Sequence, residues 1–143
     1  MTVKAILAAK GGDVVTIEPN ASLEQAAKIL AERRIGALVV TGPEQRVVGI
    51  VSERDIVSTL AAHGSQALGV PLTTIMTRKV TTCSPSDTIS TIMERMTAGK
   101  FRHVPVVEQG RLTGIVSIGD VVKHRLQEME SEQNALRDYI QTA

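Results

Sequence analysis

The feature that most constrains the fold is an internal duplication: the same unit of about sixty residues occurs twice. When Pro19 is aligned with Pro85, Leu23 falls on Ile89 and Leu30 falls on Met96, and the apolar positions between them keep step. A period of this length is typical of a supersecondary unit that buries its apolar face against a neighbouring copy. A unit of about sixty residues buries only about 60% of its unfolded surface and is marginal alone. We therefore predict that the two repeats pack on each other.

Each repeat contains the same short motif. Residues 49–55 read GIVSERD, and residues 114–120 read GIVSIGD. The two copies of the motif are 65 residues apart, whereas the aligned positions before them are 66 apart. Its glycine allows another group to approach the backbone. Its Ser and Asp lie where a strand gives way to a helix, whose N-terminus favours anions. An ionised carboxylate also accepts hydrogen bonds from sugar hydroxyls. The motif thus predicts a site for a sugar and a phosphate, although an Asp here also serves as a plain helix N-cap.

The hydrophobic periodicity predicts the order β-α-β-β-α in each repeat. Strands are expected at 14–17, 37–41, 47–52, 80–82, 104–107 and 112–117. Helices are expected at 3–10, 23–34, 53–62, 71–77 and 88–98, and from 120 onward. Ser22 and Gln25 have the spacing of a capping box. We expect helix 3–10 to pack on the first repeat and the aperiodic stretch 63–70 to connect the repeats.

Two tandem units of this form resemble a pair of CBS (cystathionine β-synthase) domains, over about residues 12–124. The family's phosphoribosyl pattern, Gly, apolar, any, Ser or Thr, any, any, Asp, is matched at both 49–55 and 114–120. The resemblance implies an α/β fold with two repeats related by pseudo-twofold symmetry, an adenosyl ligand between them and a homodimer. The expected divisions are an N-terminal helix and turn (1–12), the first repeat (13–62), a connection with a short helix (63–79), the second repeat (80–124) and a C-terminal helix extension (125–143).

The resemblance also suggests which residues bind the ligand. Asp120 and Asp55 are expected to bind ribose, and the cations near residue 100 to bind phosphate, since arginine donates two parallel bonds to it. The purine is expected to lie on strand residues, for each of which core packing is the ordinary role. For the second-repeat site the candidates are Thr82, Cys83, Lys100, Arg102, His103, Val104, Pro105, Ser117 and Asp120. For the first-repeat site they are Thr16, Ile17, Ala37, Leu38, Val39, Ser52, Arg54 and Asp55.

The two sites are not expected to be equivalent. The first repeat has Gly36 and Ala37 where the second has Arg102 and His103. We therefore expect the Asp120 site to prefer a phosphorylated ligand, and the Asp55 site to be weaker or to accept a different nucleotide. Cys83 lies among the candidates either as a small buried hydrophobe or as a reactive thiol.

Composition argues against several other classes of protein. The formal net charge is +1 and there is no Trp, which gives no electrostatic or stacking surface for nucleic acid or a membrane. A single cysteine excludes an internal disulfide and a thiolate zinc site, so we expect no metal and a cytoplasmic protein. We also expect no enzyme activity, because the spacing supports no nucleophile-base arrangement among Ser52, Ser117, His63, His103 and His124.

The last helix is expected to continue beyond its counterpart in the first repeat. A seam with 4-3-4-3-4 spacing runs along it, formed by Val122, Leu126, Met129, Gln133, Leu136 and Ile140. Such a narrow apolar stripe packs against another helix. Two interpretations have equal standing: the helix folds back on its own domain, or it forms a contact between the helices of a dimer.

The function that follows is that of a sensor that binds AMP and transmits its occupancy to a regulated protein of unknown identity. NADH, ATP or an S-adenosyl compound are alternative ligands for the same clefts. A second alternative is an interaction module that keeps the fold without a ligand, and a small enzyme is the least favoured.

Overall fold

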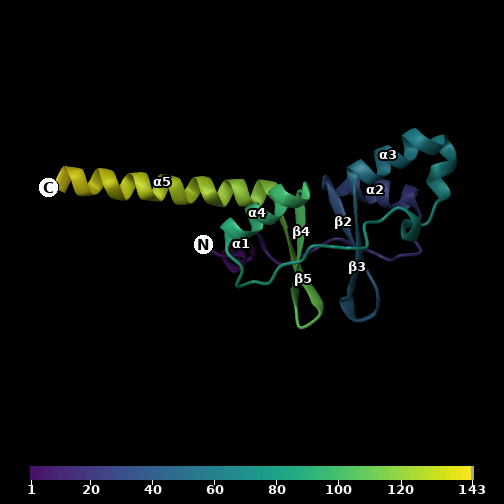
Figure 1. Ribbon diagram of the computed structural model, residues 1–143, viewed down its shortest axis with the longest axis horizontal. Helices are drawn as coiled ribbons and strands as arrows, with labels where there is room; N and C mark the ends of the chain where they lie inside the picture. Colours follow the sequence, from purple (N-terminus) through teal and green to yellow (C-terminus); the bar gives the residue numbers. More distant parts are fainter. Residues whose placement is uncertain (143) are drawn as a thin grey trace.

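The structure is a computed structural model that describes residues 1–142. It contains two small sheets side by side, each covered by helices, with one long helix projecting from the body (Figure 1). The predicted α/β fold of two packed repeats is confirmed. Among the described residues no helix is both long and apolar enough to cross a bilayer.

The first repeat is built on a three-stranded sheet in the order β1-β2-β3. Strand β1 (Thr16–Ile17) runs parallel to β2 (Ala37–Thr41), which pairs in antiparallel fashion with β3 (Val47–Ser52). Helix α2 (Leu23–Arg33) begins at the predicted capping box, and α3 (Glu53–His63) follows β3 directly. The short 3-10 helix η1 (Pro43–Gln45) forms the turn between β2 and β3.

The second repeat has the same plan with one strand fewer. Strand β4 (His103–Glu108) pairs in antiparallel fashion with β5 (Arg111–Ser117), and the helices are α4 (Ile89–Gly99) and α5 (Ile118–Thr142). The predicted strand at 80–82 is wrong. Only Cys83 reaches β4, where its backbone exchanges hydrogen bonds of 3.0 and 2.9 Å with Pro105 and Val107. The residues before it diverge toward the first repeat.

Helix α1 (Val3–Lys10) packs on the second repeat, so the prediction that it packs on the first is wrong. Val3 and Ile6 are fully buried in a cluster with Ile92, Val104 and Val116. The Val3 backbone N–H also donates to the Asp87 carbonyl over 2.9 Å. Gly11, at a φ of 92° that suits glycine, then lets the chain turn away toward the first repeat.

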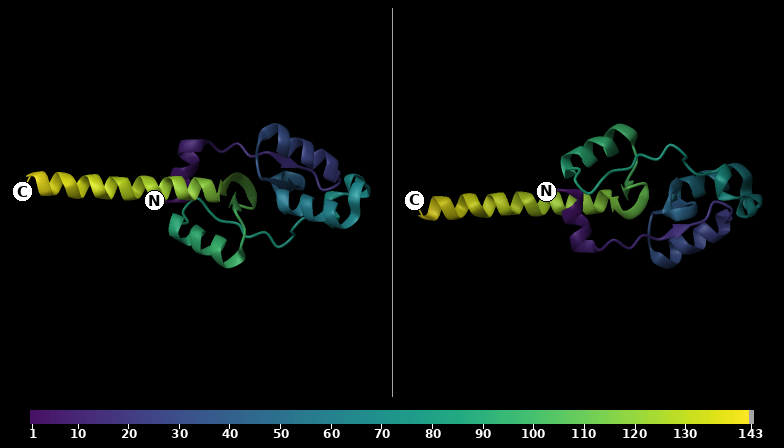
Figure 2. Two further views of the ribbon diagram at one scale, coloured as in Figure 1. Left: turned by 90° about the horizontal axis from the view of Figure 1, so that it is seen from above. Right: turned by 90° about the horizontal axis from the view of Figure 1, so that it is seen from below.

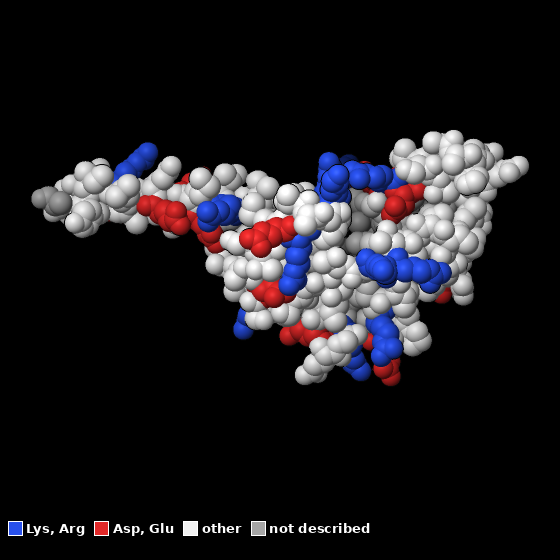
Figure 3. All heavy atoms as spheres, in the orientation of Figure 1, with Lys and Arg blue, Asp and Glu red and all other residues white. Residues whose placement is uncertain are grey.

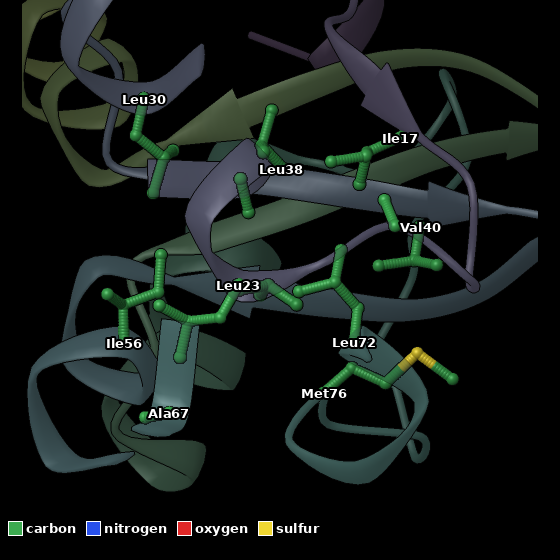
Figure 4. Close-up of a cluster of buried hydrophobic side chains, with 12 residues drawn as sticks. Ile17, Leu23, Leu30, Leu38, Val40, Ile56, Ala67, Leu72 and Met76 are labelled. Atoms are coloured by element: carbon green, nitrogen blue, oxygen red, sulfur yellow. The ribbon is translucent and has the colours of Figure 1, made fainter. Parts of the chain in front are cut away.

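The segment that leads into the second repeat likewise packs on the other repeat, the first, so that the two repeats exchange their leading segments. It forms two 3-10 helices, η2 (Gly64–Gly69) and η3 (Leu72–Thr74), so the helix predicted at 71–77 is shorter and more tightly wound than expected. Ala67 and Leu72 are fully buried in the core of the first repeat, together with Leu23, Leu38 and Val51 (Figure 4). Each repeat therefore completes its core with the segment that precedes the other repeat.

The close approach predicted at the motif glycines is made by these exchanged segments. A Cβ atom at Gly114 would lie 2.7 Å from Leu7 Cδ2, and one at Gly49 would lie 2.6 Å from Met76 Sδ. Real Cβ contacts are longer than this, so a side chain at either position would displace its neighbour. The glycines thus serve the packing of each repeat against the segment that completes its core.

Helix α5 contacts its own domain only along its first part. Helices α1 and α4 flank its start (Figure 2), where Val121 and His124 are buried. The side chains of residues 129–142 are exposed. The interpretation in which this helix folds back on its own domain is therefore wrong for its second half.

Candidate functional site

Both motif aspartates form reciprocal capping boxes. At the β3–α3 junction the Ser52 backbone N–H donates to Asp55 Oδ2 over 2.9 Å, and the Asp55 N–H donates to Ser52 Oγ over 3.4 Å. Ser117 and Asp120 repeat these bonds at the β5–α5 junction, at 2.9 and 3.2 Å. The aspartates therefore stabilise the helix starts from the third helical position, after Ser52 and Ser117, and the expectation that they are themselves the N-cap residues is wrong. In the first box the Asp55 carboxylate accepts from the Ser52 backbone N–H and hydroxyl through Oδ2 alone, so that Oδ1 can accept from a ligand.

A cavity of about 740 Å³ opens beside Asp55, within the range of small-molecule sites. Four segments form it: the start of β2, the β3–α3 junction, the chain that crosses between repeats, and the segment that leads into β4. Both repeats therefore contribute walls. The polar and charged residues that line it are Ser52, Glu53, Arg54, Asp55, Ser58, Thr77, Lys79, Thr81, Lys100, Arg102 and His103.

The cavity carries more positive than negative side chains. Arg54, Lys79, Lys100 and Arg102 line it, against two carboxylates. Figure 3 shows charged side chains of both signs gathered around a hollow in the upper middle of the molecule. None of the ion pairs formed within residues 1–142 involves these four cations. Their charges are thus available to an anionic ligand.

His103 occupies the boundary between the repeats. An added Cβ atom at Gly36 would lie 3.2 Å from His103 Cε1 and 3.2 Å from Glu53 Oε1, so this glycine makes room for both side chains. Burial lowers the pKa of His103 below 6.5, although the Glu53 carboxylate opposes that shift. A neutral imidazole at pH 7 can accept as well as donate a hydrogen bond.

At the equivalent position of the second repeat, a side chain of the protein itself bonds the Asp120 carboxylate. Lys10 Nζ donates to Asp120 Oδ2 over 2.7 Å and to the Ile115 carbonyl over 2.9 Å. Burial alone raises the pKa of Asp120, but the hydrogen bonds from Lys10 and Ser117 and the Lys10 charge together lower it below 3.8. A ligand at Asp120 has to displace this ion pair.

The structure therefore groups the candidate phosphate partners differently from the prediction. Lys100, Arg102 and His103 belong to the second repeat, yet they line the cavity of Asp55. The reason is the packing of the pair, which brings the segment before β4 to the motif of the first repeat. Sequence reasoning missed Gly36, Glu53, Lys79 and Thr81, whose only signal was their position between recognisable elements.

The predicted purine-binding residues fall mostly outside this cavity. Of the first-repeat set, Ala37, Ser52, Arg54 and Asp55 line it. Leu38, Val39 and Val104 are fully buried, and Ile17, Cys83 and Pro105 are buried as well. Thr16 and Thr82 are exposed. These positions pack the two cores and their margins, which was the ordinary role considered for them.

Cys83 has the properties of a small buried hydrophobe. It is 6% exposed within the core of the second repeat. Burial, which is the larger cause, and the nearby Asp87 carboxylate raise the pKa of its thiol to about 11. The thiol is therefore protonated at pH 7 and a poor nucleophile.

The Lys10–Asp120 pair predicts a specific acid response. Because the folded-state pKa of Asp120 is depressed, its contribution to stability is present above about pH 4 and is lost as the pH falls through the folded value. A Lys10→Met variant should lose less stability on acidification than the wild type, by about 1 kcal/mol or less since both groups are partly exposed. Urea unfolding at pH 6 and pH 3 measures this difference. Equal pH dependence in both proteins would contradict the assignment.

Comparison with known proteins agrees with this architecture. The family model described as CBS domain matches residues 3–62 and 72–127. The chain is 31% identical over 148 residues to the CBS domain-containing protein CBSX3, mitochondrial, of Arabidopsis thaliana, covering 98% of this chain and 72% of that protein.

Solved structures show the same fold. The CBS-domain containing protein ATU1752 from Agrobacterium tumefaciens has a TM-score of 0.84 and 48% identity, over 87% of this chain and 99% of that one. The CBS domain pair of MJ0100, in complex with 5-methylthioadenosine and S-adenosyl-L-methionine, has a TM-score of 0.80 and 29% identity, over 90% and 98%. The duplicated unit, the paired motifs and these matches together show that the chain belongs to the CBS domain family, as a tandem pair of CBS domains.

Proposed function

We propose that the protein is a regulatory protein that binds an adenine nucleotide, with AMP as the favoured ligand, in the cavity beside Asp55. The observation that carries the proposal is the meeting, in one cavity, of a motif carboxylate from the first repeat with Lys100 and Arg102 from the second. The similarity to the MJ0100 pair, which was solved with two adenosyl ligands, supports an adenosyl group.

The charges of the cavity distinguish between adenosyl ligands. S-adenosylmethionine carries one carboxylate but a net positive charge from its sulfonium and ammonium groups, and methylthioadenosine carries no charge, so neither matches a site with four surrounding cations. A phosphate does, because charge-assisted bonds to Lys and Arg are stronger than neutral ones. AMP is therefore favoured over the ligands of MJ0100, and ATP or NADH remain alternatives with more phosphate.

The roles we assign within the site follow the chemistry of the residues that line the cavity. Asp55 accepts from the ribose hydroxyls, and the backbone N–H groups at the start of α3, with Arg54 nearby, face the phosphate. Lys100 and Arg102 approach the phosphate from the other repeat. The main site is thus proposed at Asp55 and the weaker one at Asp120, the reverse of the ranking from the sequence.

Binding in this position suits regulation better than catalysis. A ligand held by both repeats shifts their relative arrangement by the difference in its affinity for the two arrangements. A regulated protein or domain in contact with the pair then senses that shift. An interaction module without a ligand remains the second candidate.

A ligand panel tests the proposal. Thermal unfolding is measured with AMP, adenosine, ADP, ATP, NADH, S-adenosylmethionine and methylthioadenosine. Binding to the folded state adds RT ln(1 + [L]/Kd), about 2.7 kcal/mol at a hundredfold excess over Kd, which is a shift of several degrees. We expect a larger shift with AMP than with adenosine, and a Lys100→Ala/Arg102→Ala variant should reduce that gap. A cooperative unfolding transition that none of the ligands moves would favour the interaction module.

A further inference from the structure

The exposed face of α5 is the largest feature that nucleotide binding does not explain. Its apolar side chains are Val122, Leu126, Met129, Leu136 and Ile140, each between 46% and 65% exposed. With Gln133 they follow a heptad pattern in which Val122, Met129 and Leu136 are d positions and the others are a positions. We call these six residues the α5 seam. It spans about 27 Å at 1.5 Å per residue.

The α5 seam faces away from the protein's own domain. Val121, His124 and Glu128 contact that domain, the last through an ion pair of 3.4 Å with the N-terminal amine. At 100° per residue these positions lie about 100° to 160° around the helix from the centre of the seam. The domain therefore holds one side of α5 while the opposite side stays open for a partner along its whole length (Figure 1).

We propose that the α5 seam is an interface with a second copy of this chain, in which two α5 helices form a parallel, in-register coiled coil. The charges beside the seam carry the argument. In a parallel pair each g residue faces the e residue of the next heptad on the partner helix. Arg125 then faces Glu130, and Glu132 faces Arg137, and symmetry forms each pair twice.

An antiparallel pair has no such match. The register that keeps the apolar layers together is centred near Ser131, and it places e residues opposite e residues and g residues opposite g residues. Glu130 then faces Glu130, Glu132 faces Glu132, and Lys123 faces Arg137. Every contact between charged residues in that arrangement is repulsive.

Gln133 adds a second argument for the same orientation. It is the one polar residue at an a position of the seam. In the parallel arrangement it meets its own copy, and the two amides can hydrogen-bond to each other, as polar a residues do when they fix register. In the antiparallel arrangement it faces Met129, and the amide has no partner in the seam.

Two adjacent substitutions test the interface. Leu136→Glu places a charge in the seam, and Ala135→Glu places the same charge on the far side of the helix. Sedimentation equilibrium should show that Leu136→Glu weakens self-association by about a hundredfold or more, because each dimer loses two buried leucines. Ala135→Glu should associate as the wild type does. A monomeric wild type at high concentration, or equal behaviour of both variants, would overturn the proposal.

A charge exchange tests which residues face each other. Glu132→Arg should weaken the dimer about fivefold, because it places a positive charge opposite Arg137 of the partner helix, and symmetry repeats this repulsion twice in each dimer. Glu132→Arg/Arg137→Glu should restore the affinity. Residues five apart do not meet on one helix, so rescue can arise only between chains. A double variant no tighter than the single one contradicts the parallel pairing.

A cysteine at the end of the seam reports whether the two α5 helices run parallel or antiparallel, even if the domains also associate. Ile140→Cys should form an interchain disulfide under mild oxidation, since residue 140 is an a position and meets residue 140 of the partner helix in the parallel pair. In the antiparallel register the same two residues lie about 27 Å apart. Cys83 is buried and does not compete. A chain that dimerises without this cross-link has another interface.

Discussion

An Ile6→Ala variant is expected to lose about 2 to 5 kcal/mol of unfolding free energy, the cost of a large-to-small change in a packed core. Residue 6 lies near the N-terminus, where substitutions are ordinarily tolerated. Here its side chain is fully buried against the second repeat, nearly a hundred residues further along the chain. Denaturant unfolding followed by circular dichroism measures the loss.

The matched control is Lys4→Ala on the same helix. Its side chain is exposed, and the backbone bond from its N–H to the Pro85 carbonyl survives the change. The control should stay within about 0.5 kcal/mol of the wild type. If Ile6→Ala costs as little as the control does, α1 is not part of the second core.

Asp55→Ala is expected to weaken AMP binding by about tenfold or more, while Asp120→Ala changes it little. A hydrogen bond to a charged group contributes about 1.5 to 3 kcal/mol, and the ribose loses its carboxylate acceptor. The two variants form a matched pair, because each removes the aspartate carboxylate from an equivalent Ser–Asp capping box at the start of a helix. Isothermal titration with AMP measures both.

Loss of the helix cap has to be separated from loss of the ligand contact. Removing a cap costs about 0.5 to 2 kcal/mol of stability in either variant. Asp55→Asn keeps an oxygen that can accept from the Ser52 N–H but removes the charge, so it should bind with intermediate affinity. If Asp120→Ala abolishes binding and Asp55→Ala does not, the ranking of the two sites is wrong.

The sequence alone was sufficient for the repeats and for most of their local elements, although not for the segments at 71–77 and 80–82. Strands β2 and β3 have the predicted bounds, and the Ser22–Gln25 capping box is present. These features depend on neighbours within a few residues, through side-chain alternation or a bond across one helical turn. A duplicated pattern also doubles the evidence for each element.

The arrangement of the repeats was harder to predict, because it depends on contacts between distant residues. Helix α1 has the same apolar periodicity whichever repeat it covers, so its pattern does not distinguish the two. Lys100 was assigned to the motif of its own repeat for the same reason. Only the packing of the two repeats against each other brings it to Asp55. Lys10, which pairs with Asp120, belongs to no pattern that the sequence shows.

The α5 seam lies between these cases. Its spacing was visible in the sequence, but spacing alone did not separate packing on the domain from packing on a second helix. The structure separates them, since Val121 and His124 already use the other side of the helix. The partner's orientation then follows from charges that were present in the sequence throughout.

A crystal structure of the protein grown with AMP would show directly whether an adenine nucleotide binds beside Asp55. We expect AMP in the Asp55 cavity, with its ribose on the Asp55 carboxylate and its phosphate within reach of Lys100 and Arg102, and the Lys10–Asp120 ion pair intact. AMP bound at Asp120 with Lys10 displaced and the Asp55 cavity empty, at saturating nucleotide, would contradict this expectation.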